Sequence, residues 1–116
     1  MKLLAVLFAA SLVSLAAQEV YRPGNGVSVP TVIKEVKPEY TEAAKQAHVE
    51  GNVLLDVVVS PEGSVTTVSV ARSLDTNYGL DNQAVAAAKE WKFKPGTKDG
   101  KPVAVRVMIE LNFTLK

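Results

Sequence analysis

The chain has 116 residues, of which 47% are hydrophobic, and its 13 basic residues nearly balance 12 acidic ones. A chain of this length forms one domain with short extensions, and its near-neutral charge excludes nucleic-acid binding that depends on a basic surface. Because the chain contains no cysteine, disulfide bonds, thiolate metal sites and a lipid-modified cysteine anchor are excluded as well.

The first segment has the pattern of a secretory signal peptide, which we place at residues 1–16. Lys2 precedes an apolar run from Leu3 to Val13, and small residues follow up to Ala16, where cleavage is expected. The alternative is a membrane anchor. A spanning helix needs about 20 apolar residues, however, and Gln18 ends the apolar character of this run early.

Two irregular segments and a short helix are predicted next. Residues 17–30 form a linker, because Pro-Gly-Asn-Gly at positions 23–26 interrupts any regular element. Residues 31–36 form a short strand or an extended arm. Thr41 is then expected to be the N-cap of a first helix, which runs to Ala47 and stops around His48 to Gly51, where Gly51 can take a positive φ.

A β-hairpin and a second helix follow. Apolar residues alternate from Val53 to Val59, and the turn Pro61-Glu62-Gly63 leads into a second strand at residues 65–71. The first strand is apolar on both faces at Leu54 and Val58, which favours a central position in the sheet. Asp81 is predicted to be the N-cap of the second helix. One face of this helix carries four apolar residues, Leu80, Ala84, Ala87 and Trp91.

The last segment is one long alternating strand. Every odd position from Val103 to Leu115 is apolar, and most even positions are polar. Such alternation indicates a strand with one buried face. Its length and its place at the end of the chain favour an edge of the sheet, where backbone groups are open to a partner.

These elements predict an α+β fold. We expect a small two-layer sandwich, in which an antiparallel or mixed three-stranded sheet carries two helices on one face. The chain order is a β-hairpin, a helix and a long C-terminal edge strand. The first hairpin strand lies at the centre, and Trp91 and Phe93 pack in the core; the alternative for these two aromatic residues is an exposed ligand platform.

The sequence gives little support for an enzyme. His48 is the only histidine, so histidine-based triads and histidine metal clusters have no basis, and we interpret it as a polar residue at a helix end. Asp56 and Glu110 are strand carboxylates, which we expect to pair with basic neighbours such as Arg106 rather than to act as an acid–base pair. We therefore predict no catalytic residue, no metal site and no cofactor.

Several of these pieces, taken in order, resemble the C-terminal domain of the TonB family over residues 31–116. The matching stretches are Pro38-Glu39-Tyr40, Glu50-Gly51-Asn52-Val53, Pro61-Glu62-Gly63-Ser64-Val65, Arg72-Ser73, Leu80-Asp81, Trp91-Lys92-Phe93-Lys94-Pro95, Gly100-Lys101-Pro102-Val103 and Asn112-Phe113-Thr114-Leu115. None of them is specific alone, but their order and spacing together are.

The resemblance implies a periplasmic module that grips the extended TonB box peptide of an outer-membrane transporter by strand addition, with no small-molecule substrate. In the family the segment before the first helix lies near the bound peptide, so Tyr40, close to Pro38 at the start of that helix, either lines the peptide groove or packs structurally, with neither alternative favoured. The candidate partner-binding residues are therefore Lys37, Tyr40, Val105, Arg106, Val107, Met108, Ile109, Glu110, Leu111, Asn112 and Phe113. Long edge strands also pair with copies of themselves, so the alternative is an assembly protein that homodimerises or joins an envelope complex through this strand.

The chain departs from complete energy transducers of the family, which have a membrane helix bearing a functional histidine and a long proline-rich spacer. Here residues 1–16 contain no histidine, and residues 17–30, with two prolines, reach about 45–50 Å when fully extended. We therefore expect a stand-alone exported domain in the periplasm. A form anchored in the inner membrane and facing the periplasm is the less favoured alternative. The sequence does not name the transporter or its cargo.

Export is directly testable. If residues 1–16 are a signal peptide, the mature protein begins at Ala17 and is recovered in the soluble periplasmic fraction. Intact-mass measurement of the fractionated protein checks this, and a species that retains Lys2 in the membrane fraction would revive the anchored alternative.

Overall fold

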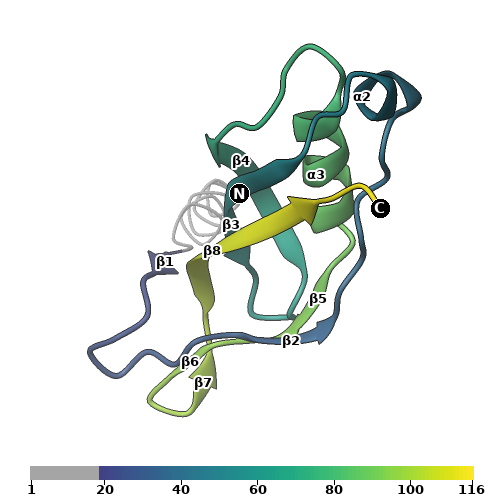
Figure 1. Ribbon diagram of the computed structural model, residues 1–116. Helices are drawn as coiled ribbons and strands as arrows, with labels where there is room; N and C mark the ends of the chain where they lie inside the picture. Colours follow the sequence, from purple (N-terminus) through teal and green to yellow (C-terminus); the bar gives the residue numbers. More distant parts are fainter. Residues whose placement is uncertain (1–18) are drawn as a thin grey trace, which may run out of the picture.

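The computed structural model describes residues 19–116, and the predicted signal peptide lies outside the described residues. Its main sheet has four strands in the order β1-β8-β3-β4, which are Val20–Tyr21, Ala104–Phe113, Gly51–Val59 and Val65–Arg72 (Figure 1). The predicted hairpin and C-terminal strand are all present, with β3 in the centre, antiparallel to both neighbours. The α+β class is confirmed, and the sheet has one strand more than the three predicted.

The extra strand comes from the segment predicted to be a linker. Val20 and Tyr21 pair in parallel with Ala104 and Val105. After the turn at residues 24–27, the Ser28 amide donates to the Thr97 carbonyl at 2.9 Å. This part of the chain therefore contacts the domain, because its backbone groups find partners on β8 and on the following hairpin.

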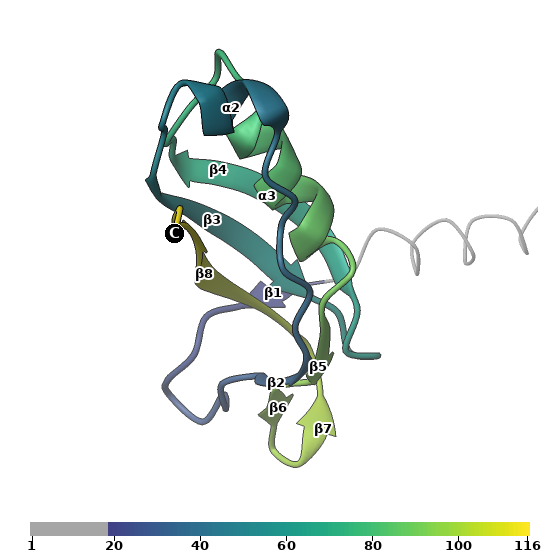
Figure 2. The same cartoon turned by 45° about the vertical axis from the view of Figure 1, so that its right-hand side comes forward.

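Two short ribbons complete the β-structure. The predicted arm is β2 (Thr31–Lys34), which pairs antiparallel with β5 (Lys92–Lys94). A second ribbon joins β6 (Thr97–Lys98) to β7 (Lys101–Pro102). Both ribbons lie at the end of the molecule away from the helices (Figures 1 and 2).

The first helix, α2 (Glu42–Gln46), begins as predicted. The Thr41 hydroxyl accepts a hydrogen bond from the Ala44 amide at 3.1 Å, which makes Thr41 the N-cap. The last helical residue is Gln46, one residue before the predicted Ala47, which is the C-cap. The chain turns within the predicted stop, where His48 takes the left-handed conformation at φ 56° and Gly51 opens β3 at φ 143°. The exposed His48 is a polar residue at a helix end, as interpreted.

The second helix, α3 (Leu80–Ala88), begins differently from the prediction. Gly79, at φ 90°, is its N-cap, and Asp81 lies in its first turn. The Asp81 carboxylate faces back to the preceding loop, where it accepts from the Leu74 and Asp75 amides, both at 3.0 Å. The N-cap prediction at Asp81 was wrong because its carboxylate serves this loop instead of the helix amides.

The core lies between the sheet and the two helices, which cover one face of it (Figure 2). Leu55, Val57 and Leu80 are fully buried there. Trp91 follows the last turn of α3 and is 5% exposed, and its indole nitrogen donates to the Val36 carbonyl at 2.9 Å. The core interpretation of Trp91 is confirmed, and Phe93, also buried, lies 6.1 Å away between ring centroids.

The predicted turn at residues 61–63 requires its glycine. Gly63 has φ 88°, and an added Cβ would lie 2.1 Å from the Phe93 carbonyl oxygen. The Phe93 amide donates to the Gly63 carbonyl at 2.8 Å. The close approach allowed by glycine thus attaches the hairpin turn to β5.

Candidate functional site

Within residues 19–116, the outer edge of β8 is one of two open backbone edges of the sheet, the other being the outer edge of β4. The inner edge of β8 pairs with β3 from Val105 to Phe113, whereas β1 covers only Ala104 and Val105 on the outer side. In the described part of the chain, no strand pairs with the outer side from Arg106 to Phe113. Alternate residues of an edge strand direct their amide and carbonyl groups outward, so this stretch can accept another strand.

The side chains of β8 divide between two faces. Those at odd positions share the helix-covered face with the core residues of β3, and Leu111 and Phe113 are buried there. Those at even positions lie on the open face, where Met108 is 51% exposed. A strand added at this edge would therefore extend both faces of the sheet. One of these faces continues the hydrophobic core, and the other is exposed to solvent.

A groove of about 450 Å³ borders the far end of this edge. Its walls come from two distant parts of the sequence, the segment before α2 and the end of β8. The lining residues are Glu35, Lys37, Pro38, Tyr40, Glu110, Leu111, Asn112, Phe113, Thr114 and Lys116. The groove thus brings Lys37 and Tyr40 together with the last four predicted residues of β8. Glu35, Pro38, Thr114 and Lys116 were not predicted.

Tyr40 connects the groove to the core. Its ring packs edge-on against Phe113, with centroids 5.4 Å apart and planes at 85°. Its hydroxyl donates to the Val49 carbonyl. Burial, and then the charge of Glu50, raise the pKa of the Tyr40 phenol. Tyr40 is therefore a neutral donor that joins the groove wall, which it lines, to the core.

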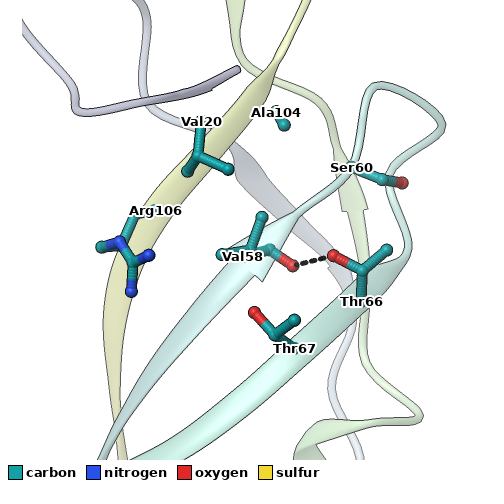
Figure 3. Close-up of a pocket in the computed structure, with 7 residues that line it drawn as sticks. All are labelled: Val20, Val58, Ser60, Thr66, Thr67, Ala104 and Arg106. Atoms are coloured by element: carbon teal, nitrogen blue, oxygen red, sulfur yellow. Dashed lines mark hydrogen bonds between the residues drawn. The ribbon is translucent and has the colours of Figure 1, made fainter. Parts of the chain in front are cut away.

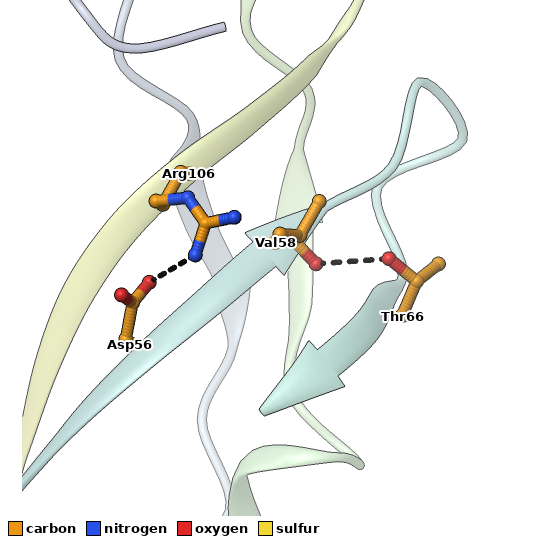
Figure 4. A network of polar contacts seen from close by, with 4 residues as sticks. All are labelled: Asp56, Val58, Thr66 and Arg106. Carbon is orange, nitrogen blue, oxygen red and sulfur yellow. Dashed lines mark hydrogen bonds and ion pairs between the residues drawn. The ribbon is translucent and has the colours of Figure 1, made fainter. Parts of the chain in front are cut away.

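The strand carboxylates are paired with arginines, as predicted. Arg106 Nη1 lies 3.1 Å from Asp56 Oδ1 across β8 and β3 (Figure 4). Glu110 lies 3.7 Å from Arg72 and also accepts from the Asn52 amide group at 3.3 Å. These pairs are partly or largely exposed and contribute little free energy. Their effect is to order the side chains on the open face beside the edge.

A second hollow lies at the other end of the edge, on the open face of the sheet. It has a volume of about 260 Å³. Figure 3 shows Val20 of β1 beside Ala104 and Arg106 of β8, with Val58, Ser60, Thr66 and Thr67 completing the lining. The hydroxyl of Thr66 already donates to the Val58 carbonyl at 3.4 Å. This hollow was not predicted, because two residues are too few for an alternating pattern to reveal β1.

The predicted residues are therefore not equivalent in space. Val107, Met108 and Ile109 lie mid-edge, the last four border the groove, and Val105 lies where β1 covers the outer side. No cluster of three or more potential metal-binding side chains occurs within residues 19–116. Neither helix in that range is long and apolar enough to cross a bilayer.

Comparison with known proteins identifies the family of the chain. The family model described as Gram-negative bacterial TonB protein C-terminal matches residues 36–115. Protein TonB of Xanthomonas campestris pv. campestris (strain B100) is 43% identical over 91 residues, which cover 78% of this chain and 40% of that protein. Protein TonB of Vibrio cholerae is 33% identical over 91 residues, which cover 78% of this chain and 37% of that protein.

A solved structure has the same fold. The solution NMR structure of the Pseudomonas aeruginosa TonB CTD aligns with a TM-score of 0.61 at 20% identity, over 80% of this chain and 90% of that one. The chain spans about two fifths of the length of these curated relatives. The family match covers most of the described residues, including every residue that lines the groove except Glu35 and Lys116. The chain belongs to the family of Gram-negative bacterial TonB C-terminal domains.

Proposed function

We propose that this domain binds the TonB box of an outer-membrane transporter by adding it as a strand to the outer edge of β8. The observation that carries the proposal is the unpaired edge from Arg106 to Phe113 with the groove at its far end. In strand addition the backbone provides the affinity and alternate side chains provide the selectivity. The edge of β8 offers both sources of binding energy, because its free backbone groups lie next to ordered side chains.

The proposed interaction is of modest strength. A peptide of about six residues buries little surface, so a dissociation constant on the order of micromolar is expected without other contacts. Such an affinity suits a contact that must form and release. Membership in the TonB family supports a role in energising transport across the outer membrane, with a binding function and no catalysis.

We place this function in the periplasm, where the domain would arrive through a cleaved signal peptide. An inner-membrane-anchored form facing the same compartment is the alternative, and the export experiment above distinguishes the two. In either form, the partner is an outer-membrane transporter that is dependent on TonB. How the domain would receive energy depends on which form exists.

A peptide titration tests the binding mode. A TonB box peptide from a transporter of the same organism is expected to perturb backbone amides from Arg106 to Phe113, together with that of Tyr40, in two-dimensional NMR spectra. The perturbation persists at moderate salt, because no charged patch drives it. A peptide with proline at its centre is expected to lose binding, since proline removes a ladder donor and fits poorly in paired strands.

The turn at residues 61–63 provides the internal control, because it lies away from the groove. Shifts confined to that turn, or unchanged binding of the proline-containing peptide, would exclude strand addition at β8. No saturable response to any such peptide would favour homodimerisation through the same edge. Sedimentation at increasing concentration then decides, since a monomer throughout contradicts the assembly alternative.

A further inference from the structure

The near end of the receiving edge is occupied by the chain itself. β1 runs parallel to β8 and pairs Val20 with Ala104 and Tyr21 with Val105. It lies in line with the open stretch that begins at Arg106, as the strand order shows (Figure 1). A peptide that follows the edge of β8 past Arg106 therefore meets β1.

β1 is held by few contacts. Its pairing covers two residues, and Val20 remains 45% exposed. The ammonium group of Lys98 lies 4.9 Å from the centroid of the Tyr21 ring, a cation–π contact at the surface. Within residues 19–116, the Tyr21 hydroxyl donates to Glu19 alone, two residues away. Displacing β1 would disturb neither the core nor the ion pairs found within residues 19–116.

The hollow beside Val20 indicates which kind of side chain could replace Val20 after β1 is displaced. Val58 and Ala104 form its apolar floor, and Arg106 already pairs with Asp56. The Thr66 hydroxyl is also engaged, with the Val58 carbonyl. The hollow therefore offers space next to apolar surface and no free charge, which suits a small branched apolar side chain such as the valine that now lines it.

We propose that β1 is a displaceable stand-in for the partner strand, and that it sets the register and length of the peptide accepted by β8. With β1 in place, the edge accepts residues only alongside Arg106 to Phe113. A longer partner peptide displaces β1, pairs with Ala104 and Val105, and places an apolar side chain in the hollow that Val20 lines. This inference rests on the proposed strand addition at β8.

The size of the effect follows from competition. A segment that occupies its site nine tenths of the time lowers the apparent affinity of a competing ligand by about tenfold. The penalty applies only to peptides long enough to reach Ala104. A short peptide confined to the open stretch does not compete with β1 and loses no affinity. Peptide length therefore distinguishes peptides that must displace β1 from those that need not.

The test uses the full chain and a double substitution, Val20→Pro with Tyr21→Pro. Proline at both positions removes both amide donors of β1, whichever of them pairs with β8. Affinity is measured by calorimetry for the TonB box peptide at about six residues, and for two forms extended by Val-Thr-Val-Thr at either end, about ten residues long, which is enough to run from Phe113 to Ala104. The double variant is expected to bind one extended form about tenfold more tightly than the parent does, and the short form equally.

A milder pair of variants provides a matched control. Lys98→Ala removes the cation–π contact and is expected to raise affinity for the same extended peptide about two- to fivefold. Lys101→Ala removes the lysine that pairs with Lys98 across the same ribbon but makes no cation–π contact within residues 19–116, and it is expected to change nothing. This pair also provides the answer if the double proline variant does not fold.

The outcomes separate the inference from the function on which it rests. If the short peptide binds the parent but no variant improves binding of either extended form, β1 is not a competitor and the inference is overturned. If none of the three peptides binds the parent or the variants, strand addition at β8 fails and the inference fails with it. A selective gain for one extended form supports both and assigns the peptide direction.

Discussion

Replacing Trp91 with alanine is expected to lower the free energy of unfolding by about 3–5 kcal/mol, the range for large aromatic truncations in cores. The side chain is 5% exposed and packs beside Phe93 where α3 meets the sheet. The substitution also leaves the Val36 carbonyl without its indole donor. A domain of this size has about 5–10 kcal/mol of stability, so the variant is expected to be partly unfolded at 37 °C.

Urea unfolding followed by circular dichroism measures this loss. Trp91→Phe retains much of the buried volume and is expected to lose less, because it gives up the hydrogen bond and part of the ring. Lys92→Ala, next in the chain and exposed in β5, serves as the surface control and is expected to unfold like the parent. A midpoint for Trp91→Ala that matches the parent would mean that the indole is dispensable for the core.

The fold was largely predictable because its main strands carry long local patterns. The thirteen-residue alternation ending at Leu115 is strong enough to identify β8 alone. The doubly apolar β3 could be placed in the centre for the same reason, since only a strand with neighbours on both sides tolerates Leu54 and Val58 on the second face. The alternation of apolar residues and the residue types in the turns are local signals. In this domain the tertiary contacts favour the same strands that these local signals predict.

The site was predictable only in part, since its geometry depends on contacts between distant segments. The edge of β8 followed from its position in the chain, whereas the groove needs Glu35 and Pro38 to lie beside Thr114. β1 escaped prediction because two residues carry no period, and the turn at residues 23–26 indicated a linker. Lys37 was predicted through the family resemblance alone, whereas Tyr40 was also marked by its place near Pro38 at the start of the first helix.

The start of α3 shows the same limit. A carboxylate just inside a predicted helix normally reads as an N-cap, yet the carboxylate that reaches the first amides comes from Asp75, in the preceding loop. Asp75 Oδ2 accepts from the Leu80 amide at 3.0 Å, and its Oδ1 accepts from the Asn77 and Tyr78 amides at 2.9 Å. When a loop residue folds back to accept hydrogen bonds from the first amides of a helix, its distance in sequence from that helix is not fixed. The sequence therefore carries no recognisable spacing for such a cap.

Asp75 is accordingly the second position where a large effect is expected. Its carboxylate is 8% exposed, and burial by itself raises the pKa. The amides of Leu80, Tyr78 and Asn77 together outweigh burial and hold the pKa of Asp75 below its ordinary value of 3.8. Because the pKa is depressed in the folded state, the resulting stability is present above the ordinary value and is lost as pH falls through the folded-state value.

Asp75→Asn removes the charge and one acceptor and should therefore cost about 2–3 kcal/mol at pH 7, as hydrogen bonds to charged groups do. It should also remove the contribution of this group to acid destabilisation below about pH 4. Urea unfolding of parent and variant at pH 7 and at pH 3 measures both effects. The difference between the two proteins is expected to shrink at the lower pH.

Asp99→Asn is the matched control, because Asp99 is exposed in the turn between β6 and β7, at φ 52°, a conformation that asparagine also adopts. It is expected to leave stability unchanged within about 0.5 kcal/mol at pH 7. Equal stability of Asp75→Asn and the parent at pH 7 would mean that the loop amides find other partners. A difference that stays constant down to pH 3 would mean that Asp75 acts through its shape and not through its charge.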